Sequence, residues 1–351
     1  METNITNMGQ CLFLSDVMAV PEGPTYVTTI FTCLLNSVFS ITATVANSVI
    51  LWIIIKDPNL HNPVNSFLSC LALSDLVIGA VTQPAYVVYK IAELLVARKV
   101  SCAARVVHWV FGWICAGVSM FTITAIAMER FLKLHLHLRY MTVVTNKRAL
   151  QVTVAFWLVS IAIILSLFAI RSDRYWTFVP APIMLLNLVI TLTSYWKIFR
   201  ILEKHRAQIR TQLQPVSHAG LNMKRYQKST VTAVSILGLL LFCYVPFFCA
   251  MVTRVIVGYT TPVKIAYECG ATFVYLNSTL NPALYWRRIP DIRRAVVQFA
   301  QRSGCFCCTC VTVVSTPDNS VVVSRTWDVR KSSAFVFEER STTRELNLLA
   351  L

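Results

Sequence analysis

Seven apolar stretches, each long enough to cross a lipid bilayer, constrain this 351-residue chain more than any other feature. A membrane-spanning helix needs about 20 predominantly apolar residues. The third stretch is the least distinct because both of its flanks are less apolar. Together they predict an all-α membrane protein, a seven-helix bundle with spans at residues 26–55, 63–91, 102–134, 149–170, 180–202, 230–257 and 263–286.

The composition excludes a soluble protein. Hydrophobic residues make up 56% of the chain and charged residues 14%, whereas soluble domains carry about 25% charged residues. The net charge of +16 would suggest a nucleic-acid partner for a soluble protein, but membrane proteins collect Lys and Arg in their cytoplasmic loops. We therefore expect no nucleic-acid partner.

The basic residues predict the orientation of the chain. Among the Lys and Arg that flank the spans, sixteen fall on the side of the C-terminus and seven on the side of the N-terminus. The positive-inside rule then places the N-terminus outside and the C-terminus in the cytoplasm, for a multi-pass protein of the plasma membrane. Asn4 begins an Asn-Ile-Thr glycosylation pattern, which fits an extracellular N-terminus.

Strongly polar residues lie inside the apolar stretches. Such groups at membrane depth are expensive unless they are paired, so each is a functional candidate. One acid among amides and hydroxyls could hold a Na⁺ ion, a proton or a water cluster. A hydrogen-bonded packing cluster without an ion is an equally good interpretation. The set comprises Asn47, Asp75, Ser119, Asn277, Ser278 and Asn281.

A charged pair and two prolines mark the spans further. Glu129 and Arg130 close the third span, either as a functional pair or as side chains that extend to the membrane interface. Pro246 and Pro282 lie within the sixth and seventh spans, where each removes a backbone hydrogen bond and permits a kink. Kinked helices suit a two-state switch, but proline is also common in membrane helices.

Over residues 26–302 the chain resembles the rhodopsin-like (class A) G-protein-coupled receptors. The resemblance is carried by Asn47 in the first span, Leu71, Ala72 and Asp75 in the second, Glu129-Arg130-Phe131 in place of Asp-Arg-Tyr, and Trp157, Tyr195 and Pro246 in the following three. The seventh span carries Asn277-Ser278-Thr279-Leu280-Asn281-Pro282-Ala283-Leu284-Tyr285, which matches the Asn-Pro-x-x-Tyr signature.

The resemblance implies a signal-transducing receptor rather than an enzyme. Its expected partners are an extracellular ligand, a heterotrimeric G protein, membrane lipids and an arrestin. Five of the six polar residues match the family's sodium pocket, namely Asp75, Ser119, Asn277, Ser278 and Asn281. Arg130 would face the G protein, Tyr195 and Tyr285 would support the active state, and Pro246 would be the pivot for outward movement of the sixth helix. The implied switch set is Glu129, Arg130, Tyr195, Tyr244, Pro246, Pro282 and Tyr285.

Several positions depart from the family pattern. Arg105 stands where the family has a cysteine, Cys102 lies three residues earlier, and residues 171–179 contain no cysteine. We therefore expect the customary outer disulfide to be absent. Tyr244 replaces a Trp, and Asn187 replaces the proline of the fifth span. These changes motivate the hypothesis of high ligand-free signalling.

The expected ligand pocket lies between the third, sixth and seventh spans. Gly112 replaces the acid that binds amines, and Tyr275 replaces the lysine that binds retinal, so neither ligand is expected. The very short outer loop weakly resembles the melanocortin and lipid-sensing branches. An aromatic floor under a basic rim suits an apolar or aromatic ligand with an acidic group, although aromatic packing alone explains the pattern as well. The predicted pocket residues are Arg105, His108, Trp109, Gly112, Trp113, Ala116, Phe247, Phe248 and Tyr275.

The C-terminal part is predicted to lie in the cytoplasm. Residues 286–297 have the pattern of a short amphipathic eighth helix, and a cysteine cluster follows. Its tight spacing argues against zinc and favours S-palmitoylation. We expect an extracellular segment at 1–25, a receptor domain at 26–303 and an unstructured tail at 304–351 that could be phosphorylated and bind arrestin. The predicted palmitoylation sites are Cys305, Cys307, Cys308 and Cys310.

Two other functions compete with a receptor. A multi-pass transporter could use an ion site around Asp75, but the chain has no recognisable inverted repeat. A membrane enzyme would need converging His, Asp or Glu residues, and His135 and His137 lack partners for this. No cofactor is expected beyond a structural Na⁺. The identity of the ligand and the G-protein subtype stay open.

Overall fold

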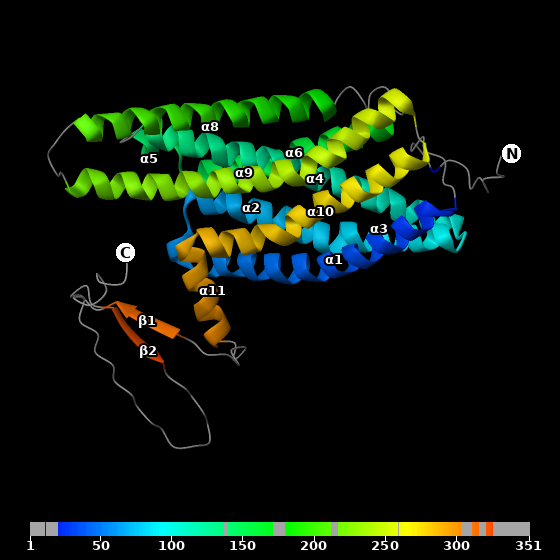
Figure 1. Ribbon diagram of the computed structural model, residues 1–351, viewed down its shortest axis with the longest axis horizontal. Coiled ribbons are helices and arrows are strands. Elements are labelled where there is room, and N and C mark those ends of the chain that lie inside the picture. The colour runs from blue at the N-terminus through cyan, green and yellow to red at the C-terminus, as the bar shows by residue number, and fades with distance from the viewer. Residues whose placement is uncertain are drawn as a thin grey trace, which may run out of the picture. The chain divides into compact units, whose positions relative to one another are not determined.

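The computed structural model describes residues 11, 20–136, 139–170, 180–211, 217–258, 260–302, 311–315 and 321–325. The chain divides into two compact units, Met1–Arg294 and Ala295–Leu351. The first unit is a bundle of long helices (Figure 1).

Seven long helical rods fall within the described residues, and each of the seven predicted stretches lies inside one of them. α2, η2 and α3 follow one another without a break and form a single rod. The elements are α1 (Pro24–Lys56), η1 (Pro58–Leu60), α2 (Pro63–Val77), η2 (Ile78–Thr82), α3 (Gln83–Leu94), α4 (Arg98–Leu136), α5 (Tyr140–Val143), α6 (Asn146–Ile170), α8 (Pro180–Thr211), α9 (Ser217–Val257), α10 (Thr261–Arg288) and α11 (Pro290–Arg302).

Local signals explain where several helices begin. Proline stands in the first turn of α1 and α2, where its missing N–H needs no partner. The Asn62 side chain caps α2 by accepting a hydrogen bond from the Asn65 N–H at 2.9 Å. Pro290 begins α11 rather than interrupting it.

The helices differ in how apolar they are. Among the described residues, four rods contain stretches long and apolar enough to cross a membrane on composition alone, namely Pro24–Lys56, Pro63–Leu94, Arg98–Leu136 and Asn146–Ser166, and α9 contains a shorter one at Leu241–Val257. α10 is less apolar because it carries buried polar groups such as Glu268, Asn277 and Asn281. The buried polar side chains of α10 therefore face the interior of the bundle.

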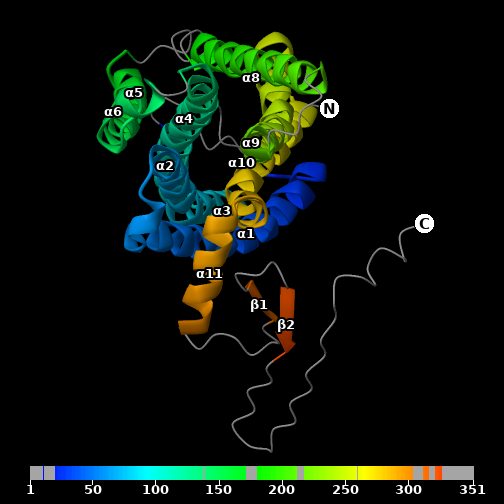
Figure 2. The same ribbon diagram turned by 90° about the vertical axis from the view of Figure 1, so that its left-hand side faces the viewer.

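α4 contacts α2, α3, α6, α8 and α9, and it lies between α6 and α9 in the end-on view (Figure 2). α1 packs against α10 and against the α2–η2–α3 rod. At Gly79, a Cβ atom would lie 2.8 Å from the backbone nitrogen of Thr44, so the close approach of η2 to α1 requires glycine. The Ser40 hydroxyl donates a 2.7 Å hydrogen bond to the Gly79 carbonyl at the same contact.

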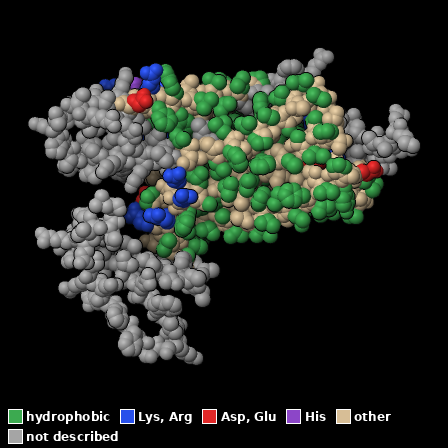
Figure 3. Space-filling model, in the orientation of Figure 1, with side chains coloured by type: hydrophobic (Ala, Val, Ile, Leu, Met, Phe, Trp, Pro, Cys, Tyr) green, Lys and Arg blue, Asp and Glu red, His purple; other side chains and the backbone are tan. Residues whose placement is uncertain are grey.

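The outward-facing surface of the bundle is apolar. Large hydrophobic side chains such as Val27, Leu34, Ile41 and Ile55 are exposed along α1. One face of the bundle is covered mainly by hydrophobic side chains (Figure 3). A surface of this kind is stable against lipid and would aggregate in water.

Two expectations for the C-terminal part need correction. Residues 286–288 continue α10, and the amphipathic helix begins only at Pro290, after the chain turns at Ile289. The tail was expected to be unstructured, but strands β1 (Val311–Ser315) and β2 (Val321–Arg325) pair in antiparallel register, with Val313 opposite Val323. Both strands are rich in valine, whose branched side chain favours the extended backbone.

Candidate functional site

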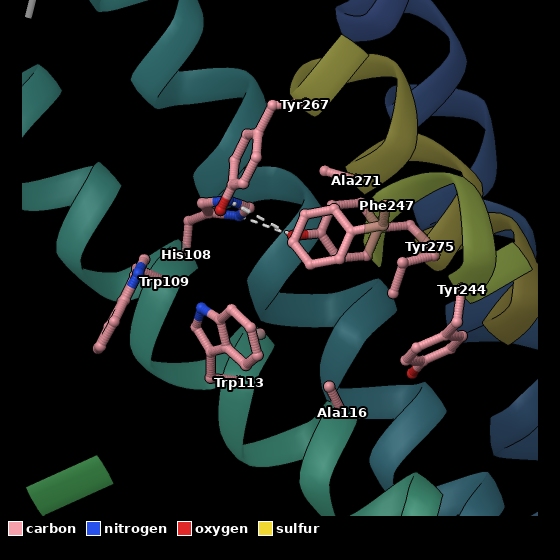
Figure 4. A pocket seen from close by; sticks show the side chains of 11 residues that line it. His108, Trp109, Trp113, Ala116, Tyr244, Phe247, Tyr267, Ala271 and Tyr275 are labelled. Carbon is pink, nitrogen blue, oxygen red and sulfur yellow. Dashed lines mark hydrogen bonds between the residues drawn. The ribbon is translucent and has the colours of Figure 1, made fainter. Parts of the chain in front are cut away.

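A cavity opens between α4, α9 and α10, toward the end of the bundle at which α1 begins; we call this the pocket end. Its empty volume is about 520 Å³, which includes open solvent at its mouth. Figure 4 shows the aromatic side chains around it. It is lined by His108, Trp109, Gly112, Trp113, Ala116, Tyr244, Phe247, Tyr267, Ala271, Val274 and Tyr275.

The structure brings seven of the nine predicted pocket residues to this cavity. The other two, Arg105 and Phe248, do not line it. Arg105 is buried nearby, with its guanidinium 5.8 Å from the centre of the Tyr89 ring. Phe248 is 40% exposed on the outside of α9. Sequence reasoning missed Tyr267, Ala271 and Val274, although they follow the helical spacing of Tyr275 on α10.

Aromatic contacts and one hydrogen bond shape the cavity. The Phe247 ring lies 5.0 Å from Tyr267 and 6.0 Å from Trp113, centre to centre. A Cβ atom on Gly270 would lie 2.8 Å from the Phe247 Cα, so glycine allows α10 to approach α9 here. The Tyr275 hydroxyl is hydrogen-bonded to the His108 ring, with 3.2 Å to Nδ1 and 3.4 Å to Nε2 (Figure 4).

A buried group of charges, the Lys90 triad, lies at the pocket end and comprises Lys90, Glu93 and Glu268. The Lys90 ammonium donates to Glu93 at 2.9 Å and to Glu268 at 2.7 Å. All three side chains are almost completely buried. The triad therefore joins α3 to α10 by ion pairs shielded from water. Lys90 and Glu93 are three residues apart in the sequence, but Glu268 is 178 positions from Lys90, so the sequence does not indicate the triad.

The predicted polar core is buried, and parts of it are directly bonded. Asn281 donates to the Asp75 carboxylate at 2.8 Å, which joins α10 to α2. Asn47 donates to the Ser278 carbonyl at 3.0 Å, which joins α1 to α10. Ser119 lies 3.1 Å from the Ser74 hydroxyl.

Several oxygens of this core have no hydrogen-bond partner among the residues that the structure describes. They include Asn47 Oδ1, Asp75 Oδ1 and Asn281 Oδ1. Carboxylate and amide oxygens are hard ligands of the kind that bind alkali and alkaline-earth cations. The donor set therefore fits a Na⁺ ion or an ordered water, and the presence of Na⁺ stays a prediction.

At the opposite end of α4, Glu129 and Arg130 form a partly buried pair, with Arg130 Nε 3.5 Å from Glu129 Oε2. Tyr140, in α5, donates a 2.5 Å hydrogen bond to Glu129 Oε1. Burial raises the pKa of Tyr140, and the Glu129 charge raises it further, so the hydroxyl keeps its proton at neutral pH. Sequence reasoning missed Tyr140 because it lies beyond the third span, in the short helix α5.

The remaining residues of the predicted switch set lie in the bundle interior or within α9 and α10. Tyr195 and Tyr285 are buried, and within the described part of the chain neither hydroxyl has a hydrogen-bond partner. Pro246 is inside α9 and Pro282 inside α10. Tyr244 lines the floor of the cavity.

A disulfide joins Cys11 to Cys102 at the start of α4, with 5.5 Å between their Cα atoms. The customary outer disulfide was expected to be absent because residues 171–179 contain no cysteine. The Cys11–Cys102 bond was not predicted, because Cys11 lies in the N-terminal segment. Asn4, the loop at 171–179 and the predicted palmitoylation sites lie outside the described residues.

The sequence matches the model of the family described as 7 transmembrane receptor (rhodopsin family), over residues 46–176 and 172–285. These ranges cover more than half of the chain, and the chain belongs to this family. It is therefore a seven-transmembrane, rhodopsin-type receptor of signal transduction, as its motifs indicated.

Proposed function

We propose that this receptor binds an extracellular ligand in the cavity between α4, α9 and α10 and activates a heterotrimeric G protein through Arg130. The N-terminus would face the outside of the cell and the C-terminus the cytoplasm. Outward movement of the cytoplasmic end of α9, at the same end of the bundle as Arg130 of α4, would open the surface that the G protein binds. A ligand drives such a change only if it binds the open state better than the closed one.

One observation carries this proposal: the cavity touches both helices that such a switch needs. Tyr244 and Phe247 line it from positions on either side of Pro246, where α9 lacks a backbone hydrogen bond. Ala116 lines it from α4, and Arg130 lies on the same helix, about 21 Å further along at 1.5 Å per residue. A ligand that moves the Tyr244 and Phe247 side chains therefore acts directly at the hinge.

The test is guanine-nucleotide exchange on a panel of purified G proteins, with the receptor reconstituted in lipid nanodiscs. Ligand-free exchange above that of empty nanodiscs is expected for at least one G protein, because the replaced switch residues motivate high basal signalling. Arg130→Ala should abolish it. Lys56→Ala removes a cation at the same end, stacked 4.9 Å from the Trp52 ring, and should leave it unchanged. Equal exchange by wild type and Arg130→Ala contradicts the proposal.

The proposed ligand is an apolar or aromatic molecule with an acidic group. The floor of the cavity is aromatic, and a cation lies beside one of its lining residues: Arg254 is 5.7 Å from the Tyr267 ring centre, and Lys264 precedes Tyr267 by three residues in the chain. A positive mouth attracts anions by long-range electrostatics. Arg254→Ala should weaken binding of an acidic ligand and leave binding of its neutral amide unchanged.

We propose further that the polar core binds Na⁺ through Asp75, with Asn47, Ser119, Asn277, Ser278 and Asn281 around it. The partnerless oxygens described above support this. Sodium added to the reconstituted receptor should lower ligand-free exchange, and Asp75→Asn should remove the effect. The same sensitivity to potassium as to sodium would argue against a selective site.

The proposal extends to the C-terminal part of the chain. Cys305, Cys307, Cys308 and Cys310 would carry palmitoyl chains that bind membrane lipid, and the phosphorylated tail would bind arrestin. Acyl labelling that survives Cys→Ser changes at all four positions would rule out the first of these.

A further inference from the structure

A hydrogen-bonded group inside the bundle, which we call the Asn187 clasp, joins α8 to α4 and comprises Thr124, Asn187 and Thr191. The Thr124 hydroxyl lies 3.2 Å from the Asn187 amide oxygen and 2.9 Å from the Thr191 hydroxyl. All three side chains are buried. Hydrogen bonds between polar side chains help to hold membrane helices together, so this group connects α8 to α4.

The orientation of the Asn187 amide follows from its second contact. The amide nitrogen donates to the Ile183 carbonyl at 2.9 Å, one turn earlier in α8. A carbonyl oxygen can only accept a hydrogen bond, so the amide oxygen is the atom that faces Thr124. Among the residues that the structure describes, Thr124 is the only side-chain donor that reaches this oxygen. The hydrogen bond between the helices therefore runs from Thr124 to Asn187.

Each threonine of the clasp has a second acceptor in its own helix. The Thr124 hydroxyl lies 3.0 Å from the Met120 carbonyl, and the Thr191 hydroxyl lies 2.8 Å from the Asn187 carbonyl. A hydroxyl has one hydrogen, so it donates either across the two helices or back to its own helix. When the clasp is formed, Thr191 donates to Thr124 and Thr124 donates to Asn187.

The clasp can open at a small cost. If α8 moves away from α4, both threonine hydrogens turn to the carbonyls of their own helices and stay bonded. The Asn187 amide nitrogen keeps its Ile183 partner, and only the amide oxygen loses its donor. One such bond in a membrane protein shifts an equilibrium by about three-fold on average and by about eighteen-fold at most. A contact of this size can bias two arrangements of the helices and still permit both.

The clasp is present together with a paired Arg130. Arg130 lies six residues after Thr124, about 9 Å further along α4. Its Nε is 3.5 Å from the Glu129 carboxylate, which is the closed state of the proposed switch. Beside it, the Lys197 ammonium of α8 lies 5.4 Å from the Phe131 ring centre. A displacement of α8 that opens the clasp therefore also moves a cation next to Arg130.

We propose that the Asn187 clasp restrains ligand-free signalling by stabilising the closed state, and that the clasp opens on activation. From the sequence, the replacement of the usual proline by Asn187 is one of the changes that motivate the hypothesis of high ligand-free signalling. The contacts of Asn187 indicate that this particular replacement acts in the opposite direction. The inference rests on the proposed function in taking nucleotide exchange on a G protein as the output.

The first test is ligand-free guanine-nucleotide exchange by the receptor in lipid nanodiscs. Asn187→Leu replaces the amide by an apolar group that branches at the same atom, and Thr124→Val removes the donor without changing the shape. Each should raise exchange by about three-fold or more. The matched control is Thr193→Val in the same helix, which should leave exchange unchanged. The Thr193 hydroxyl is exposed and donates to the Val189 and Ile190 carbonyls of its own helix.

A double variant separates the hydrogen bond from a change in packing. Asn187→Leu and Thr124→Val remove the same contact, so the double variant should exchange nucleotide no faster than the faster single variant. Thr191→Val leaves the bond from Thr124 to Asn187 in place and should have a smaller effect than either. Melting temperatures verify that each variant is folded.

A second readout needs no G protein. Spin labels at Met141, in α5, and Arg200, in α8, report by double electron–electron resonance how far α8 lies from the segment that follows α4. In Asn187→Leu, a distance that is minor in wild type should grow by about three-fold. Thr193→Val should give the wild-type distribution.

Three results overturn the proposal: exchange that is unchanged or lower in Asn187→Leu, single-variant effects that multiply in the double variant, or a distance distribution that stays the same in Asn187→Leu. If no G protein responds to the wild-type receptor, the proposed function fails and the distance measurement still decides on the clasp. Conversely, a receptor that exchanges nucleotide equally well with and without the Asn187 amide would retain the proposed function and lose this inference.

Discussion

The Lys90 triad gives a prediction whose size follows from its burial. Lys90 is 1% exposed and is the ion-pair partner of both Glu93 and Glu268. Lys90→Met leaves two buried carboxylates close together without their cation. Breaking a buried pair in this way costs about 3–5 kcal/mol. At roughly 2 °C per kcal/mol for a chain of this size, the melting temperature should fall by about 6–10 °C.

The assay is thermal unfolding of the purified receptor in nanodiscs, followed by tryptophan fluorescence. The decisive control is the triple variant Lys90→Met, Glu93→Gln, Glu268→Gln, which removes both unpaired carboxylates. This variant should recover most of the stability lost in Lys90→Met, because replacing a whole buried ion group is often close to neutral. A loss below about 1 kcal/mol in the single variant would refute the reasoning, since it would mean that water reaches the triad. A triple variant as unstable as the single one would also refute it, because the damage would then be due to lost packing.

Three further predictions concern other contacts. Tyr140→Phe should raise ligand-free nucleotide exchange, because Glu129 loses a charge-assisted hydrogen bond, worth about 1.5–3 kcal/mol, that holds it beside Arg130; unchanged or lower exchange would contradict this. Replacing Cys11 and Cys102 together by serine should destabilise the receptor by about 2–5 kcal/mol in thermal unfolding, because the bond closes a long loop; a receptor whose unfolding is insensitive to reductant would argue against the bond. Gly79→Ala should cost about 1–3 kcal/mol by forcing η2 away from α1, and a stability equal to wild type would show that the contact yields freely.

Helical periodicity predicted the features that depend on a single helix. The pocket-facing side of α4, with His108, Gly112 and Ala116, follows from the spacing of about four residues that places side chains on one face. Phe247 and Phe248 were both predicted to line the pocket, and the prediction was wrong for Phe248, which faces outward while its neighbour Phe247 lines the cavity. The sequence alone did not fix this choice, because the rotation of α9 about its axis depends on its packing against α10.

Features that depend on contacts between distant segments were not predictable. The span at 63–91 was predicted without the η2 segment, whose wide turn lies where Gly79 packs against Thr44 of α1. Lys90 is one of the seven basic residues counted on the side of the N-terminus, and nothing near it in the chain indicates that it pairs with Glu268. The Cys11–Cys102 bond likewise joins residues 91 positions apart. In each case the partner is set by the assembled bundle and not by local pattern.

The central claim is that this bundle has two states and that the G protein selects the open one. Spin labels on unnatural amino acids at Met141, in α5, and Lys224, in α9, would report the distance between the two elements by double electron–electron resonance. Adding a nucleotide-free G protein that couples to the receptor should create a population with a longer distance, and GTP should remove it. A distance distribution that stays the same with G protein, in a receptor that is folded and binds it, would contradict the account.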